Sequence, residues 1–216
     1  HEDLPKNGHI SAFLVTTDTP GVSIGKPDKK MGQQGAQIAD VIFENARVPL
    51  SALLGEEEGK GFQIAMNSLN NGRLSFAAAS LGSSKRALDS AIRYGLQRTA
   101  FGEKITNFQL IQAKIADSQA EIYAMECMLR DAASKLDQGL DIRLEAACVK
   151  MFASEACGRI VDRVVQIYGG AGYIQDYDAE RFFRDSRLYR IFEGTTEIMQ
   201  LVIARTVLRE YERGLN

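Results

Sequence analysis

The chain has 216 residues, and its 26 lysines and arginines against 28 aspartates and glutamates give a formal net charge of −2. Without a basic excess to neutralise phosphates, this balance argues against nucleic acid as a partner. No apolar run approaches the roughly 18 residues that indicate a membrane-spanning helix. Three cysteines without a C-x-x-C spacing, and only two histidines, argue against a metal site and a disulfide framework. Free thiols are typical of a reducing compartment.

Residues 1–54 have the texture of short β-strands. Ile10–Val15 is an apolar run, a Pro-Gly turn signal follows it, and Val22–Ile24 and Ala39–Val48 read as further strands that end at Pro49. So few strands cannot bury a core alone, so we interpret this segment as part of an all-β domain rather than as a tail. The first methionine is Met31, and we expect the chain to be the carboxy-terminal part of a longer protein.

Residues 55–216 are helical in pattern and contain no proline. A first long helix is predicted from Phe62 to about Thr99, and a second begins near Asn107, which we expect to be its N-cap. Apolar residues spaced by three, four and seven then predict two amphipathic helices, the later one ending at Gly169-Gly170. A short helix over about 178–189 and a last one over about 195–210 complete the pattern. Long helices with short connections favour a mainly α fold, an up-down four-helix bundle.

Four motifs could carry chemistry, and each also has a purely structural interpretation. In Glu193-Gly194-Thr195-Thr196, a carboxylate and a glycine precede a helix start whose free N–H groups suit an anion, although acidic residues are common there anyway. The glycine-rich stretch 166–173 lets a backbone pass close to a ligand, or is a helix C-cap. Arg98 can fork onto phosphate or complement a helix dipole. Asn70-Asn71-Gly72-Arg73 interrupts the first helix, either for close packing or as a tolerated kink.

The three cysteines lie in helical patterns without a histidine partner. We therefore expect Cys127, Cys148 and Cys157 to be buried structural thiols.

Taken together, in this order and spacing, the motifs resemble the acyl-CoA dehydrogenase family, flavoenzymes that desaturate fatty acyl-CoA thioesters. The resemblance covers essentially the whole chain. Phe43–Pro49 looks like the end of the family's middle β domain, and Leu54–Phe62 looks like the crossover into its carboxy-terminal helical domain. Lys29–Gly32, Leu69–Arg73 and Phe101–Ile105 are most similar to the very-long-chain branch. The resemblance implies a boundary between a partial β domain, 1–54, and a helical-bundle domain, 55–216.

The resemblance also implies residue roles. The family's catalytic base is the Glu of its E-G-T motif, which is Glu193 here, and the alternative base position on the first long helix holds Gly72. The implied substrate contacts are Asn70, Asn71, Gly72, Arg73 and Gly194. The implied FAD contacts are Arg98, Phe101, Gln109, Gln166, Ile167, Tyr168, Gly169, Gly170, Thr195, Thr196 and Glu197. Two departures are Ala100, where many members have Gln or Thr, and Asn70, where short- and medium-chain members often have Asp.

The implied activity is FAD-dependent α,β-desaturation of an acyl-CoA, with electrons passed to an electron-transfer flavoprotein, in a homodimer or homotetramer. Two alternatives stay open: an acyl-CoA oxidase, which gives the electrons to oxygen, and a non-catalytic helical assembly domain. The family's amino-terminal helical domain is missing from the chain, so we expect little activity from these residues alone. A bacterial cytoplasm or a mitochondrial matrix is the expected location.

Overall fold

A computed structural model describes residues 10–214, and the first residues of the expected β segment, 1–9, lie outside the described residues. The chain forms two compact units that divide between Leu69 and Asn70. This division lies inside a helix, on the carboxy-terminal side of the predicted boundary between 54 and 55. The last strand of the first unit ends at Phe43 and the first long helix begins at Gly61, and the 54/55 boundary stays a prediction.

The first unit contains a two-stranded antiparallel ribbon. Strand β1 (Val22–Ile24) pairs with β2 (Val41–Phe43) so that Ser23 faces Ile42. The predicted strands are therefore present but shorter than their apolar runs, and Ile10–Val15 contributes only an isolated bridge from Phe13 to Leu53. Most of the unit's large apolar side chains stay exposed, because two strands of three residues offer no second layer to bury them.

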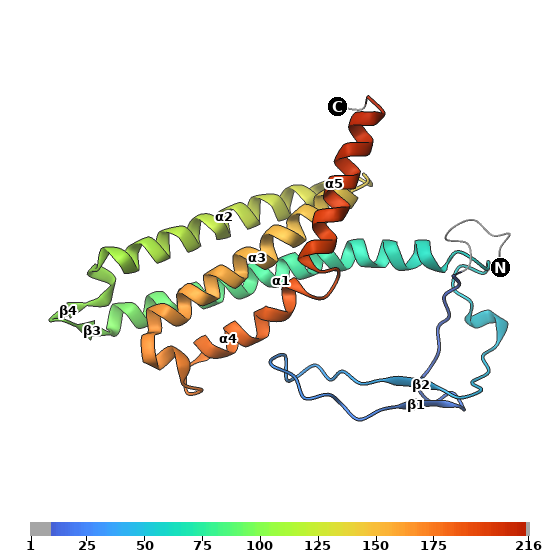
Figure 1. The fold of residues 1–216 in the computed structure, drawn as a ribbon, viewed down its shortest axis with the longest axis horizontal. Helices are drawn as coiled ribbons and strands as arrows, with labels where there is room; N and C mark the ends of the chain where they lie inside the picture. Colours follow the sequence, from blue (N-terminus) through green and yellow to red (C-terminus); the bar gives the residue numbers. More distant parts are fainter. Residues whose placement is uncertain (1–9, 215–216) are drawn as a thin grey trace. The chain divides into compact units, whose positions relative to one another are not determined.

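The second unit is helical. Helix α1 (Gly61–Gln97) leads into it, followed by the hairpin of β3 (Thr99–Ala100) and β4 (Glu103–Lys104). Helices α2 (Gln109–Asp137), α3 (Arg143–Tyr168), α4 (Asp178–Ser186) and α5 (Thr196–Glu212) complete it. Helix α3 contacts α2, α4 and α5, and Figure 1 shows α5 in red crossing the pair of α2 and α3 at a steep angle. The expectation of a mainly α domain preceded by a small β part is confirmed.

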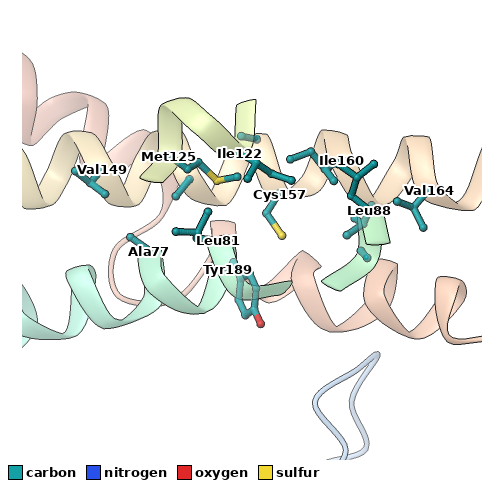
Figure 2. Close-up of a cluster of buried hydrophobic side chains, with 14 of the residues drawn as sticks. Ala77, Leu81, Leu88, Ile122, Met125, Val149, Cys157, Ile160, Val164 and Tyr189 are labelled. Atoms are coloured by element: carbon teal, nitrogen blue, oxygen red, sulfur yellow. The ribbon is translucent and has the colours of Figure 1, made fainter. Parts of the chain in front are cut away.

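The core of this unit lies around α3, which buries side chains on most of its circumference. Figure 2 shows Leu81 and Leu88 of α1, Met125 of α2 and Ile160 of α3 converging, with Tyr189 closing one side. This packing fixes α1 and α3 relative to each other, and these helices carry residues of the candidate site.

Three local predictions were wrong. Asn107 is not an N-cap: it ends a short 3-10 helix, its amide donates to Glu103 at 2.9 Å, and α2 begins after Phe108. The segment from Asn70 to Arg73 does not interrupt α1, which is helical throughout. Of the cysteines, Cys157 alone is buried, whereas Cys127 is exposed. Cys127 follows buried Met125 by two residues, which turns it about 200° around the helix and away from the core.

Cys148, the third of these residues, is only partly buried.

Candidate active site

The chain reverses sharply at Glu193-Gly194, between the 3-10 turn Arg187–Arg190 and helix α5. Both residues have left-handed backbone angles, with φ of 55° at Glu193 and 92° at Gly194. Glycine adopts such angles freely, but a glutamate does so at a cost of about 1–3 kcal/mol, which the surrounding structure has to offset. Thr195 then caps α5, because its hydroxyl accepts a hydrogen bond from the Ile198 amide at 3.3 Å.

This reversal places the Glu193 carboxylate over Gly72 of α1. A Cβ added to Gly72 would lie 2.7 Å from Oε2 of Glu193 and 3.2 Å from its Cδ. Oε2 is buried and has no hydrogen-bond partner among the described residues. A buried carboxylate oxygen without a donor is uncommon, because its desolvation is not compensated. The oxygen is therefore available to accept a proton from a bound molecule.

The surroundings of this carboxylate are aromatic on one side and cationic on the other. The Phe192 ring packs against Phe76 at a centroid distance of 4.0 Å and stacks with Tyr189 at 5.9 Å. Arg73 is buried; its Nη1 donates to the Asn70 side chain at 2.8 Å, whereas its Nε has no partner among the described residues. Burial lowers the pKa of Arg73, and the charge of Glu193 acts in the opposite direction.

Lys150 and Glu155 are site residues that the sequence reasoning missed. The Lys150 ammonium, on α3, donates to the Gly194 carbonyl at 2.6 Å. Glu155, five residues further along α3, accepts from the Thr196 hydroxyl at 2.6 Å and from Arg190 at 3.3 Å. The sequence did contain a signal for Lys150. It lies among the apolar residues of α3 that are buried, and a charged residue is rare in such a place unless it is paired.

A shallow polar depression of about 130 Å³ lies at the amino-terminal end of α5. Its lining includes Thr195, Thr196 and Glu197 together with Arg187 and Arg190. The pKa of Glu197 is lowered, chiefly by its own backbone N–H and the Thr195 hydroxyl, so this carboxylate stays ionised at neutral pH. The first N–H groups of a helix and nearby guanidinium groups can together hold an anion or a polar hydroxyl-bearing ligand.

A second open depression, of about 380 Å³, lies at the far end of α1 and α3. It is lined by Arg98, by Tyr94 and Tyr177, and by the stretch from Ile167 to Ala171. The Tyr94 and Tyr168 rings stack at 4.2 Å, and a Cβ at Gly169 or Gly170 would meet no atom within 4 Å. Open backbone beside an arginine suits a phosphate-bearing ligand.

The structure thus divides most of the predicted site residues between two separate groups. Glu193, Gly194, Gly72 and Arg73 form one group, with the α5 terminus beside it. Arg98 and the residues 167–170 form the other, and Gly72 and Arg98 are about 39 Å apart along α1 at a rise of about 1.5 Å per residue. Three predicted cofactor contacts lie outside both depressions and are exposed: Phe101, Gln109 and Gln166.

Phe101 is 98% exposed at the tip of the β3–β4 hairpin, where it and Gly102 have positive φ. Residues 10–214 contain no group of three or more His, Cys, Asp or Glu side chains placed to hold a metal ion. In the same part of the chain, no helix is both long and apolar enough to cross a membrane.

Comparison with known proteins decides the family. Residues 59–208 match the family described as acyl-CoA dehydrogenase, C-terminal domain. The chain belongs to the acyl-CoA dehydrogenase family. It is 43% identical over 206 residues to the human mitochondrial short-chain specific acyl-CoA dehydrogenase, covering 95% of this chain and 50% of that protein. It is 42% identical over 201 residues to a subunit of the caffeyl-CoA reductase–Etf complex of Acetobacterium woodii, covering 93% and 53%.

Solved structures of acyl-CoA dehydrogenases share the fold. The butyryl-CoA dehydrogenase of Megasphaera elsdenii superposes with a TM-score of 0.91 at 39% identity, covering 94% of this chain and 52% of that one. An acyl-CoA dehydrogenase from Bacillus anthracis, complexed with FAD, superposes with a TM-score of 0.89 at 38% identity, covering 95% and 38%. The chain spans about half the length of the curated relatives it matches. The very-long-chain branch stays a prediction, since these relatives carry other names.

Proposed function

We propose that this chain provides the proton-abstracting base and part of the FAD and acyl-CoA sites of an enzyme that desaturates an acyl-CoA thioester between its α- and β-carbons. The observation that carries the proposal is the buried Oε2 of Glu193, without a hydrogen-bond partner among the described residues and directly over a residue that has no side chain. A merely structural carboxylate would be paired or exposed. Family membership makes dehydrogenation the reaction to which such a base belongs.

Desaturation removes the α-hydrogen as a proton and the β-hydrogen as a hydride. We assign the proton to Glu193, whose free oxygen faces the space above Gly72. Because Gly72 has no side chain, the Glu193 carboxylate fits against α1 at this point, and no rival carboxylate stands at residue 72. Oε2 of the carboxylate is buried, and a low-dielectric setting strengthens its interaction with a bound substrate. Asn70, Asn71, Arg73 and Gly194 are the proposed substrate-side residues.

The residues of both depressions fit FAD. Arg98 and the open backbone of Gly169 and Gly170 can hold its phosphates, and Thr195, Thr196 and Glu197 can hold its polar edge at the α5 terminus. FAD, when bound, accepts the hydride from the β-carbon. The remaining proposed contacts come from the β3–β4 hairpin, the start of α2 and the end of α3: Phe101, Gln109, Gln166, Ile167 and Tyr168.

Two copies of the chain are needed to build one such site. The Glu193 group at Gly72 and the Arg98 group lie about 39 Å apart along α1, so we assign them to different sites of an assembly. We propose that Arg98 and residues 166–170 of one copy complete the site of another, in a homodimer or homotetramer.

We propose an electron-transfer flavoprotein as the acceptor of the electrons, because one relative is a subunit of a reductase–Etf complex. Bacterial and mitochondrial proteins are both among the relatives, so a bacterial cytoplasm and a mitochondrial matrix remain the proposed locations.

The test is a titration of the full-length, FAD-loaded protein with straight-chain acyl-CoA thioesters of four to sixteen carbons, without oxygen. Bleaching of the flavin absorption band, with the enoyl-CoA product detected by mass spectrometry, is the expected result, and the most efficient chain length identifies the substrate. Flavin that binds tightly and never bleaches with any thioester would contradict the proposal and favour a non-catalytic assembly domain. Comparing reoxidation by air and by an electron-transfer flavoprotein then separates an oxidase from a dehydrogenase.

A further inference from the structure

Lys150 is a buried cation behind the reversal at Glu193-Gly194, and neither the motifs nor the proposed chemistry uses it. Its side chain is 1% exposed and is among the largest fully buried side chains of the described chain. Its neighbours along α3 include Ala146, Val149 and Ala153, all buried and apolar. Lysine is almost never buried to this degree unless its ammonium has a specific partner.

The partner is the backbone of the reversal itself. Nζ of Lys150 donates to the Gly194 carbonyl oxygen at 2.6 Å, a short charge-assisted hydrogen bond across 44 positions of the sequence. Burial and the charge of Arg73 lower the pKa of Lys150, whereas the charges of Glu155, Glu193 and Glu197 raise it. The three carboxylates therefore offset part of the cost of burying the cation.

The bonded carbonyl belongs to the peptide that joins Gly194 to Thr195, directly after the left-handed pair. Glu193 and Gly194 are consecutive left-handed residues, with φ of 55° and 92°. A glutamate persists in that conformation only where its surroundings hold it there. The contacts that hold this reversal include the Thr195 cap, the packing of Phe192 on Phe76 and the Lys150 bond. Of these three, the Lys150 bond is the one made to a backbone atom of the left-handed pair.

We propose that Lys150 is a positioning residue for the proton abstraction: by fastening the Gly194 carbonyl, it holds the Glu193 carboxylate over Gly72. This inference rests on the proposed role of Glu193 as the base. Lys150 does not contact the reacting atoms in this assignment. It acts through the backbone of the reversal, so its removal misplaces the Glu193 carboxylate, whereas the substrate-side residues on α1 and the Arg98 group, which Lys150 does not hold, stay in place.

The experiment follows proton abstraction alone, in the full-length, FAD-loaded protein. A 3-thia-acyl-CoA has sulfur in place of its β-carbon, so its α-hydrogen can leave as a proton but no hydride can follow. Exchange of that α-hydrogen for deuterium from D₂O is measured by mass spectrometry, together with the dissociation constant of the analogue and the midpoint of thermal unfolding. Lys150→Met keeps the length of the side chain and removes the donor.

The expected result is an exchange rate lower by about 10- to 100-fold in Lys150→Met, since a misplacement of about 1 Å costs on that order. Binding of the analogue should change less than about twofold. The matched control is Ile160→Ala, a buried change on the same helix about 15 Å further along, which lowers the unfolding midpoint without touching the reversal. Exchange that falls no further in Lys150→Met than in Ile160→Ala would overturn the proposal.

Two further variants keep the outcomes distinct. If Lys150→Met does not fold, Lys150→Gln, whose shorter amide stops short of the carbonyl, is judged by the same comparison with Ile160→Ala. Glu193→Gln separates the two proposals. Exchange that persists in Glu193→Gln would show that Glu193 is not the base. Exchange that is lost in Glu193→Gln but unchanged in the Lys150 variants would contradict only the positioning role of Lys150.

Discussion

The carboxylate of Glu193 occupies the space that a side chain at residue 72 would need, 121 positions earlier in the chain. A Cβ on Gly72 would lie 2.7 Å from Oε2, closer than atoms of a real side chain approach. The absence of a side chain at Gly72 is therefore a requirement of the site, in the middle of a helix where glycine is otherwise unfavourable by about 1 kcal/mol relative to alanine.

Gly72→Ala should lower dehydrogenation on the order of 10²-fold, because the new methyl group displaces the carboxylate by about 1 Å. Stability should change little, since the helix gains propensity as the carboxylate shifts. The matched control is Gly82→Ala on the same helix, where no atom lies within 4 Å of the added Cβ. The free energy of unfolding of that variant, measured in urea, should rise by about 1 kcal/mol, and its activity should be unchanged. Equal activities in the two variants would contradict the assigned packing.

Glu193→Gln should lower turnover by about 10²–10⁴-fold, the usual contribution of a positioned base, while FAD and acyl-CoA still bind. The amide has nearly the shape of the carboxylate but cannot accept the proton. Stopped-flow reduction of the flavin measures the step directly. Glu212→Gln, an exposed change at the end of α5, serves as the control for loss of a negative charge. Turnover by Glu193→Gln within tenfold of the unmodified enzyme would exclude this residue as the base.

Mixing two inactive variants should restore activity if the site is shared between copies. Glu193→Gln leaves the Arg98 end intact, and Arg98→Ala leaves the Glu193 end intact, about 39 Å away along α1. In a mixed dimer one of the two sites then combines both intact ends. Co-expression with two affinity tags, followed by assays of the purified mixed species, checks this. No recovery above either parent would mean that both residues serve the same chain's site.

Cys157 should resist alkylation in the native protein. Its burial raises the pKa of the thiol to about 11, so that only about one molecule in a thousand carries the reactive thiolate at pH 8. Exposed Cys127 is the internal comparison, and unfolding in guanidinium should make both react. Mass spectrometry after timed treatment with iodoacetamide gives the two rates. Labelling of Cys157 as fast as Cys127 under native conditions would contradict its burial at the core.

The pair of Lys85 on α1 and Glu126 on α2 should make stability acid-sensitive. Hydrogen bonds from Lys85 at 2.6 Å and from Arg130 lower the pKa of Glu126 from 4.5 to about 2. Because the folded-state pKa is depressed, the contribution is fully present above about pH 4.5 and is lost as the pH falls towards 2. The difference in urea midpoint between the unmodified protein and Glu126→Gln should therefore shrink over that range. A difference that stays constant from pH 6 to pH 2 would contradict it.

Local features of the fold followed from the sequence because they depend on neighbours along the chain. The apolar spacing of α2 and α3 and the glycines at 169–170 located these helices and the end of α3 to within a few residues. A hydroxyl cap at Thr195 or Thr196 could be predicted, since a hydroxyl before a helix start satisfies a free N–H, and Thr195 is the one that caps α5. Asn107 had the same local signal and was wrong, because it ends the 3-10 helix Ile105–Asn107 and the extended residue that precedes α2 is Phe108.

Periodicity along the chain located the helices, and the order of the motifs identified Glu193 and Gly72 as candidate residues. Helix packing placed that carboxylate over Gly72, brought Lys150 to the Gly194 carbonyl, and separated the Arg98 end from the Glu193 end. Local structure depends on side-chain periodicity and capping within a few residues. Contacts between residues 44 or 121 positions apart depend on how the helices pack, and a pattern read along one chain does not contain that information.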